Sequence, residues 1–582
     1  MLKSLVDDSE ISKVYVPAFL IILLLSLLSF SNIISGEFVA DDIFYVVENE
    51  SIKSLFNLDI FFYKQSSTRN FINFNTYRPT YFFTLAIEYA LFGLNPTGYH
   101  LVNIFLHAIN GFLLYSLTLK YTSKKLLALL TALIFAVHPI HTEAVSNITG
   151  LSEVLTAFLL FFAIWCYSCS KKLDFYYLFS LVCYLLGIMS KESGVVLIGV
   201  IILIDVCSNW SNLANLRKKR IYYAGYLLTL LTYLVIKFSV RGAILNSQGL
   251  VFNKGAITER VYTMSLAFIE YFRLLIWPSK LIAFYDIFLI PIIKEPTFSV
   301  IMALCLIISL LITGIALLWY ERITAFAILF FFGTISVVAN VFFDVGVIMA
   351  ERFLYLPSTG ICLITALGLY FLINKQNNLK LLGIGLSILI LSTATVRTYT
   401  RNLDWLTSDS VRIAFLRDAP QSPRGAIMQY EKAVELFNNG QTQPAIELAQ
   451  KVASQNPNYA QAHYKTGTML QSIGKYQEAL LYLSKAKELR PNSLEIRNAY
   501  AIGLLNNGMF LEAKAELEAI IQLYPDSAET HNYLGAVYLN LQLYSQAQKE
   551  FETALMLNPN YKVAEFNLLK LYELTQTKPK SK

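Results

Sequence analysis

Two adjacent carboxylates are the residues in this sequence best placed to act as a catalytic base. Asp41 and Asp42 stand in GEFVADDIFYVVEN, a few residues after the first long apolar run. Neighbouring carboxylates resist full ionisation together, so the pKa of one of them can rise toward the range of a general base. We therefore predict that Asp41 or Asp42 accepts a proton during a reaction. The alternative is that the pair forms a solvated turn.

Cations that could hold an anionic group occur in other short polar segments. A base at one loop and cations at others suit transfer from a phosphate-linked donor, because the base takes a proton from an acceptor hydroxyl while the cations stabilise the departing phosphate. The predicted phosphate-binding residues are Arg78, His138, His141, Lys191 and Arg352. Three nearby acids are predicted to support them: Glu143, Glu192 and Glu351.

His138 and His141 also raise the question of a metal ion. They are three residues apart and would share a face of a helix, where Glu143 could complete a set of ligands. Pro139 between them favours the start of a helix, and histidines there more often cap the helix or meet an anion. A divalent metal is therefore the less favoured alternative, and the sequence establishes no cofactor.

These residues must be positioned by helices that cross a membrane. Of 582 residues, 55% are hydrophobic and only 15% are charged, whereas charged residues make up about a quarter of a soluble protein. A segment at 261–277 carries Glu270 and Arg273 and is predicted to lie at the membrane interface or inside the bundle. We predict 11 spanning helices, each in an apolar run, at residues 14–34, 100–119, 126–139, 152–169, 175–190, 194–208, 221–238, 297–319, 323–342, 353–373 and 381–397.

The short basic loops predict the orientation of these helices. Lysines and arginines near helix ends are retained in the cytoplasm, and they follow the second, fourth and sixth runs, the last group at residues 217–220. The N-terminus is then inside, and all the candidate site residues lie at outer helix ends. Eleven crossings place the chain after residue 425 outside as well. That side is the periplasm for a bacterial inner membrane, or the lumen for the endoplasmic reticulum.

The chain after residue 425 is a repeat. Prolines at 423, 457, 491, 525 and 559 are each 34 residues apart, and alanines recur with the same period. A small residue early in a second helix and a proline after it, at this period, are typical of the tetratricopeptide repeat. We predict four repeats, at 426–459, 460–493, 494–527 and 528–561, with a capping helix from about residue 562.

The repeats predict a protein partner. Such solenoids bind other chains on their concave face, and the alternatives are a spacer or a dimerisation module. Residues 426–582 carry 15 Lys and Arg and 15 Asp and Glu, so no basic surface predicts nucleic-acid binding. The predicted fold class is all-α: a polytopic membrane helix bundle at 1–425, followed by a tetratricopeptide-repeat α-solenoid at 426–582.

Six sequence motifs resemble those of a known family. They are FVADDIFYVVEN, YRPTYFFTLAIEYALFGLNPTGYHLVNIFLHAINGFLLY, LIFAVHPIHTEAVSNITG, MSKESGVVLIGVIILID, LLIWPSKL and AERFLYLPSTG. In this order, with the repeats after them, they are similar to the motifs of the transmembrane and tetratricopeptide-repeat O-mannosyltransferases and their prokaryotic relatives. The resemblance implies a GT-C type glycosyltransferase fold with about 11 transmembrane helices and a polyprenyl-phosphate donor such as dolichyl-phosphate mannose. It also implies inverting transfer to Ser or Thr hydroxyls, with the repeats on the lumenal or periplasmic side.

One motif departs from the family pattern. Where the family commonly has a glycine, a basic residue and an acid, this chain has Gly150, Leu151, Ser152 and Glu153. Because this cation is missing, the sequence does not determine which sugar is transferred. The sequence therefore predicts an integral membrane glycosyltransferase that moves mannose or another hexose from a polyprenyl phosphate to extracytoplasmic proteins. The alternatives are a non-catalytic membrane scaffold that recruits proteins through its repeats and a lipid-linked-sugar transporter.

Overall fold

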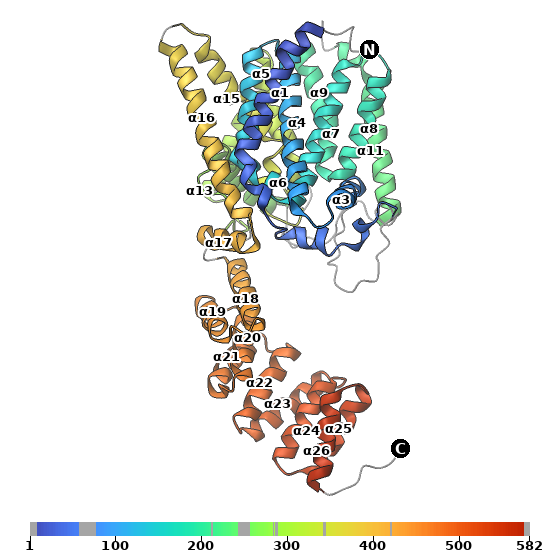
Figure 1. The fold of residues 1–582 in the computed structure, drawn as a ribbon, viewed down its shortest axis with the longest axis vertical. Coiled ribbons are helices and arrows are strands. Elements are labelled where there is room, and N and C mark those ends of the chain that lie inside the picture. Colours follow the sequence, from blue (N-terminus) through green and yellow to red (C-terminus); the bar gives the residue numbers. More distant parts are fainter. Residues whose placement is uncertain are drawn as a thin grey trace. The chain divides into compact units, whose positions relative to one another are not determined.

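The chain folds as two helical units. The computed structural model describes residues 8–56, 77–210, 214–241, 257–282, 285, 289–341, 345–376, 378–419 and 422–575. Within these ranges almost every element is a helix, and one isolated β-bridge joins Tyr285 to Met349. The compact units are Met1–Pro420 and Gln421–Lys582 (Figure 1), and each is described by itself. The predicted all-α fold class is confirmed.

The first unit is a bundle of apolar helices. Each of the eleven predicted runs lies mainly on one of them. The described helices are α1 (Asp8–Phe30), α3 (Pro79–Phe92), α4 (Pro96–Thr122), α5 (Lys125–Val137), α6 (Thr142–Ser146), α7 (Leu151–Cys169), α8 (Phe175–Ser190), α9 (Leu197–Asn209), α10 (Ala214–Lys218), α11 (Arg220–Arg241), α12 (Ile257–Ile276), α13 (Phe298–Ala316), α14 (Arg322–Ile335), α15 (Ser358–Ile373), α16 (Asn378–Asn402) and α17 (Ser408–Asp418).

Six of the described helical segments are long and apolar enough to cross a membrane. A seventh results if α5 and the segment Pro139–Ser146, which bends away by 49°, form one broken span. The other four predicted runs form shorter helices, α8, α9, α14 and α15. By length and composition, six or seven of the eleven predicted crossings are therefore accounted for, and the total stays a prediction. The charged segment predicted near 261–277 is α12, in which Arg273 pairs with Glu270 at 2.5 Å.

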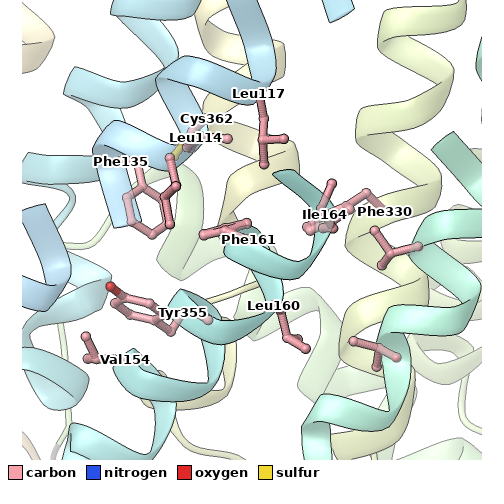
Figure 2. Packing of buried hydrophobic residues seen from close by; sticks show 14 of the residues in the cluster. Leu114, Leu117, Phe135, Val154, Leu160, Phe161, Ile164, Phe330, Tyr355 and Cys362 are labelled. Carbon is pink, nitrogen blue, oxygen red and sulfur yellow. The ribbon is translucent and has the colours of Figure 1, made fainter. Parts of the chain in front are cut away.

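Helix α7 forms the centre of the first unit. It packs against α4 and α8, and Val154, Leu160 and Phe161 on it are at most 2% exposed. Burial of such apolar surface holds the helices whose ends carry the polar loops. Figure 2 shows these residues beside side chains from neighbouring helices and from the segment before α15: Leu114, Leu117, Phe135, Phe330, Tyr355 and Cys362.

Polar loops gather where α1 and α16 end. The backbone N–H of Glu37, just after α1, donates to the carbonyl of Leu406 at 2.8 Å. At the end of α16, Nδ2 of Asn402 donates to the carbonyl of Ser29, also at 2.8 Å. Because α1 begins the unit and α16 lies near its end, these bonds join an early and a late segment of the unit at one end of the bundle.

The second unit is the predicted solenoid of four helix pairs and a cap. Its helices are α18 (Pro423–Asn438), α19 (Thr442–Gln455), α20 (Ala460–Ser472), α21 (Tyr476–Leu489), α22 (Leu494–Asn506), α23 (Phe510–Leu523), α24 (Ala528–Asn540), α25 (Tyr544–Leu557) and α26 (Lys562–Thr575). Small residues let the paired helices touch, since a Cβ added to Gly535 would lie 2.6 Å from the ring of Phe551. Stacking then buries surface that a lone repeat would expose.

The turn inside the fourth repeat is strained, and we predict that Gln542→Gly will stabilise it. Gly440, Gly474 and Gly508 close the first three turns with φ of +79°, +80° and +75°, but Gln542 takes φ +60° in the fourth. A left-handed conformation costs a non-glycine residue roughly 1–2 kcal/mol. Because glycine loses more chain entropy on folding, we expect a net gain of about 0.5–1 kcal/mol in the opening free energy of α24 and α25, measured by amide hydrogen exchange. Gly474→Gln should lower protection in α20 and α21, and lower protection in Gln542→Gly would contradict the prediction.

Candidate active site

Asp41 and Asp42 lie in a short helical turn after α1 and have different surroundings. Asp42 is fully buried: its Oδ2 accepts the N–H of Val39 at 3.0 Å and its Oδ1 accepts that of Thr149 at 2.8 Å. Burial raises the pKa of Asp42 to about 7, although these N–H groups lower it. Asp41 is exposed. Asp42 therefore ties two loops together, and Asp41 is the carboxylate that a bound molecule can reach.

Arg352 is held in place by Glu143. It lies in the 3₁₀ turn Glu351–Leu354, and Glu143 lies on α6 with its side chain only 1% exposed. Oε2 of Glu143 accepts the backbone N–H of Arg352 at 2.8 Å, and Oε1 pairs with the guanidinium. Burial alone would lower the pKa of Arg352, but the carboxylates of Glu143 and Asp41 raise it above its ordinary value. The guanidinium therefore stays charged, within electrostatic reach of the exposed Asp41.

Lys191 and Arg352 flank one aromatic ring. The Nζ of Lys191 and the Cζ of Arg352 each lie 5.5 Å from the ring centre of Phe353. Lys191 follows α8 and forms a buried ion pair with Glu153 in the first turn of α7. Burial lowers the pKa of Lys191 to about 8, with Arg78 and Arg352 lowering it further and Glu153 raising it. Two cations from distant loops thus lie near the same ring.

Arg78 forms a second ionic group beside the first. It precedes α3 and donates from Nε to Oε2 of Glu192 at 2.9 Å. The Nζ of Lys237, on α11, lies 4.0 Å from the other oxygen of Glu192. Tyr45 interacts electrostatically with both this group and the exposed acid. Burial raises the pKa of Tyr45, Arg78 lowers it and Asp41 raises it. Arg78 is thus part of the same charged end of the bundle.

The two predicted histidines are placed differently. The Nε2 of His138 contacts the carbonyl of Leu275 at 3.1 Å, and its Nδ1 accepts the N–H of Ile140 at 3.2 Å. His141 is fully buried, with Nδ1 2.9 Å from the carbonyl of Phe135 and Nε2 2.8 Å from Oγ of Ser358. Every ring nitrogen of the pair therefore has a protein partner. Among the described residues, no group of three or more His, Cys, Asp or Glu could hold a metal ion.

Glu351 has partners other than the cations that flank Phe353. It is fully buried and accepts the N–H of Ile282 at 2.5 Å and the hydroxyl of Tyr285 at 3.2 Å. The guanidinium of Arg401, equally buried, lies 3.7 Å from it. Glu351 thus anchors the Arg352 turn from behind, to the loop after α12 and to α16.

The structure groups the predicted residues into a cluster and a frame. We call Asp41, Arg78, Lys191, Glu192 and Arg352, with Glu143 and Glu153, the ionic cluster. Asp42, His138, His141 and Glu351 hold the loops around it. Four members or neighbours of the cluster were not predicted from the sequence as site residues: Tyr45, Glu153, Lys237 and Phe353. Glu153 and Lys237 carried a usable signal, because each is a charged residue inside or beside an apolar run.

The fold and the cluster define an integral membrane protein: a helix bundle with ionisable loops at one end, continued by a tetratricopeptide-repeat solenoid. Tetratricopeptide repeat family models match residues 430–493 and 528–561. The chain is 28% identical to a protein O-mannosyl-transferase of Caenorhabditis elegans over 448 residues, which cover 73% of this chain and 61% of that protein. It is also 28% identical to protein O-mannosyl-transferase TMTC3 of Homo sapiens over 412 residues, 63% of this chain and 44% of that protein.

A third relative extends the similarity. Protein O-mannosyl-transferase TMTC4 of Homo sapiens is 26% identical over 483 residues, 72% of this chain and 64% of that protein. The resemblance predicted from the six motifs is therefore confirmed. The chain spans between 44% and 64% of the length of these three relatives.

Similar solved structures cover about the length of the repeats. A MamA structure from Desulfovibrio magneticus RS-1 is 21% identical and covers 26% of this chain and 96% of that one, with a TM-score of 0.22. YrrB, described as a tetratricopeptide-repeat protein with an unusual peptide-binding site, is 22% identical and covers 31% of this chain and 87% of that one, with a TM-score of 0.25.

Proposed function

We propose that this chain is an inverting glycosyltransferase of the membrane that moves mannose or another hexose from a polyprenyl-phosphate donor to Ser or Thr hydroxyls of extracytoplasmic proteins. One observation carries the proposal: an exposed carboxylate, Asp41, interacts with Arg352, which shares the ring of Phe353 with Lys191. A base beside two convergent cations is what transfer from a phosphate-linked sugar requires. The names of the relatives support the same class of reaction.

The proposed reaction is a single displacement. A carboxylate oxygen of Asp41 takes the proton of the acceptor hydroxyl, and the hydroxyl oxygen forms a bond to the anomeric carbon. The bond from that carbon to the phosphate oxygen breaks, and its electron pair stays on the phosphate. Arg352 and Lys191 stabilise the added negative charge. Attack opposite to the leaving phosphate inverts the anomeric configuration.

The surrounding residues keep these groups in place. Glu143 fixes both the backbone and the guanidinium of Arg352, and Glu153 fixes the amine of Lys191. Such preorganisation lowers the cost of arranging charges during the reaction. In the proposal, the solenoid binds the acceptor protein and the apolar surface of the bundle contacts the polyprenyl chain. A non-catalytic scaffold does not need an exposed base beside the cations.

Loss of a hexose from extracytoplasmic proteins tests the function. Peptides from cells with and without this gene product are compared by mass spectrometry, and a hexose on Ser or Thr should disappear without it. Purified protein should restore the modification in vitro when given a polyprenyl-phosphate hexose. Unchanged glycosylation, together with no transfer in vitro, would contradict the proposed function and favour the non-catalytic scaffold.

Transfer should fall as the pH rises through the pKa of Lys191. That pKa lies near 8 because burial lowers it, so below pH 8 the ammonium can balance the phosphate, and above it the charge is lost. We expect kcat/KM to decline above about pH 8. Lys191→Arg keeps its charge throughout this range, so its alkaline decline should move to higher pH. An identical decline in both proteins would contradict the assignment.

The orientation of the repeats can be tested with a thiol reagent. The basic loops predict that the solenoid lies outside the cytoplasm, so Leu511→Cys, at a position 70% exposed, should react with a membrane-impermeant maleimide in intact cells. Lys171→Cys lies in a loop predicted to be cytoplasmic and should react only after lysis. Both signals are read above that of the unsubstituted chain. The reverse pattern would place the repeats, and the acceptor, in the cytoplasm.

A further inference from the structure

The inner face of the solenoid carries a row of side chains that the proposed reaction does not use. The first helices of successive repeats, with the cap α26, pack against one another, so they line the concave side. One position in these helices recurs every 34 residues and holds Tyr430, Tyr464, Asn498 and Asn532. We call these four residues the inner row.

The inner row converges with acidic and aromatic groups from other repeats. The hydroxyl of Tyr464 donates to the carboxylate of Glu495 in the next repeat. The same carboxylate interacts electrostatically with Tyr430, two repeats before it. Tyr464 likewise interacts with Tyr533, two repeats after it. Groups from all four repeats therefore face one another across the concave side.

This face is acidic although the solenoid as a whole is neutral. Glu495 and Glu529 occupy the same position in successive repeats and are exposed. Neither forms a salt bridge with any residue that the structure describes. Lys465, whose Nζ lies 5.2 Å from the ring centre of Tyr464, is a cation on this face. One lysine cannot neutralise both glutamates, so these three side chains together carry a negative charge.

Asn498 adds an unpaired hydrogen-bond donor to the same face. It is 5% exposed, and its Oδ1 accepts a hydrogen bond from Oγ1 of Thr530 at 3.1 Å. Its Nδ2 has no partner in the described part of the chain. A buried donor without an acceptor costs free energy, which a bound carbonyl would recover. Asn498 lies three residues after Glu495, on the same face of α22.

We infer that the inner row binds an extended, basic segment of the acceptor protein, and this inference rests on the proposed function. A backbone carbonyl of the segment accepts the hydrogen bond from Nδ2 of Asn498. Lysines or arginines of the segment pair with Glu495 and Glu529 and lie against the tyrosine rings. The acceptors are then not all proteins with an accessible hydroxyl. They are Ser- or Thr-containing chains that carry a basic segment.

Two labelled peptides test the inference on the full chain in detergent. One consists of Gly, Ala, Ser and Thr with evenly spaced lysines, and the other has glutamine at each lysine. By fluorescence anisotropy we expect the lysine peptide to bind about tenfold more tightly, as two surface ion pairs allow. The double variant Glu495→Gln, Glu529→Gln should bind both peptides alike. The matched control Glu488→Gln, Glu552→Gln removes the same charge from the second helices and should keep the preference.

The remaining outcomes separate the inference from the function. Asn498→Ala should lower the affinity for both peptides by a similar factor of about 2–10, since one hydrogen bond is lost. Equal binding of the two peptides by the unchanged chain, or no binding of the lysine peptide, overturns the inference. Sugar transfer is measured on the same peptides. A lysine peptide that binds as expected but receives no hexose from any polyprenyl-phosphate donor overturns the proposed function and leaves the binding site standing.

Discussion

Asp41→Asn is expected to lower kcat for sugar transfer by about 10²–10⁴-fold, the usual loss when a general base is removed. The change removes the charge at nearly constant volume. Asp41 is exposed, so the amount of folded protein in the membrane should stay the same. The measurement is single-turnover transfer from a polyprenyl-phosphate hexose by purified protein, with folding checked by size-exclusion chromatography in detergent.

Asp42→Asn is the matched control for this prediction. Asp42 is buried and accepts two backbone N–H groups, and asparagine would turn an amino group toward one of them. Leaving a buried group unpaired costs about 1–3 kcal/mol, so the yield of folded protein should fall while transfer per folded molecule is retained. Full activity in Asp41→Asn, with loss in well-folded Asp42→Asn, would move the base to Asp42.

Arg352→Gln is expected to lower kcat by about 10²–10³-fold, as when one stabilising donor to a developing charge is lost. The guanidinium is held by Glu143 and stays charged beside Asp41, so it is placed to stabilise the departing phosphate. Arg352→Lys keeps the charge but loses the planar guanidinium. Its kcat should therefore lie between that of the unchanged chain and that of Arg352→Gln. The corresponding change of another paired arginine, Arg273→Gln on α12, should leave kcat unchanged.

A double variant separates the lost cation from the acid it leaves behind. Arg352→Gln alone leaves the carboxylate of Glu143, 1% exposed, without its partner, which is itself destabilising. Adding Glu143→Gln removes that unpaired charge without restoring a cation. If Arg352 acts on the phosphate, the double variant folds better than the single variant but transfers no faster. Recovery of kcat in the double variant would show that Arg352 serves only to hold Glu143.

The solenoid could be predicted closely because the 34-residue period of its sequence locates the boundaries of the repeats. The predicted starts of the second, third and fourth repeats coincide with the first residues of α20, α22 and α24, at Ala460, Leu494 and Ala528. The prolines recur at a fixed period, and the first three repeats also carry a glycine in the turn, so local signals agree with the packing. The fourth turn, with Gln542 in place of glycine, has the same left-handed backbone conformation, so its position could be predicted from the period of the repeat without the glycine.

The membrane bundle could be predicted in outline but not in the geometry of its breaks. The apolar run at 126–139 ends in His138 and Pro139, and His141, Thr142 and Glu143 follow, so the sequence indicates a break here but not the bend that it makes. The structure ends α5 at Val137 and bends by 49° into the next segment at Pro139. An apolar side chain can pack against other helices in a bent segment as well as in a straight one. The apolar pattern therefore does not give the bend angle.

The loops that carry the site residues could be predicted, but the ion pairs and hydrogen bonds between those residues could not. Charged residues beside apolar runs pointed to Arg352 and Lys191, yet their partners come from α6 and α7, and only the tertiary fold brings them together. His138 and His141 had the spacing of ligands. Their ring nitrogens contact the backbone of Leu275 and Phe135 instead, and no spacing rule reveals a carbonyl that lies 137 residues away.

The closure between α1 and α16 has a consequence for biosynthesis. The loop that carries Asp41 emerges from the ribosome early, but the hydrogen bonds from Glu37 to Leu406 and from Asn402 to Ser29 form only after α16 has been made and inserted. Arg352 also arrives late. A nascent or truncated chain that stops before α16 therefore carries Asp41 without these two hydrogen bonds, and we expect such a chain to lack the proposed activity. Under the proposed function, sugar transfer would therefore require a chain whose membrane unit has been completely made and inserted.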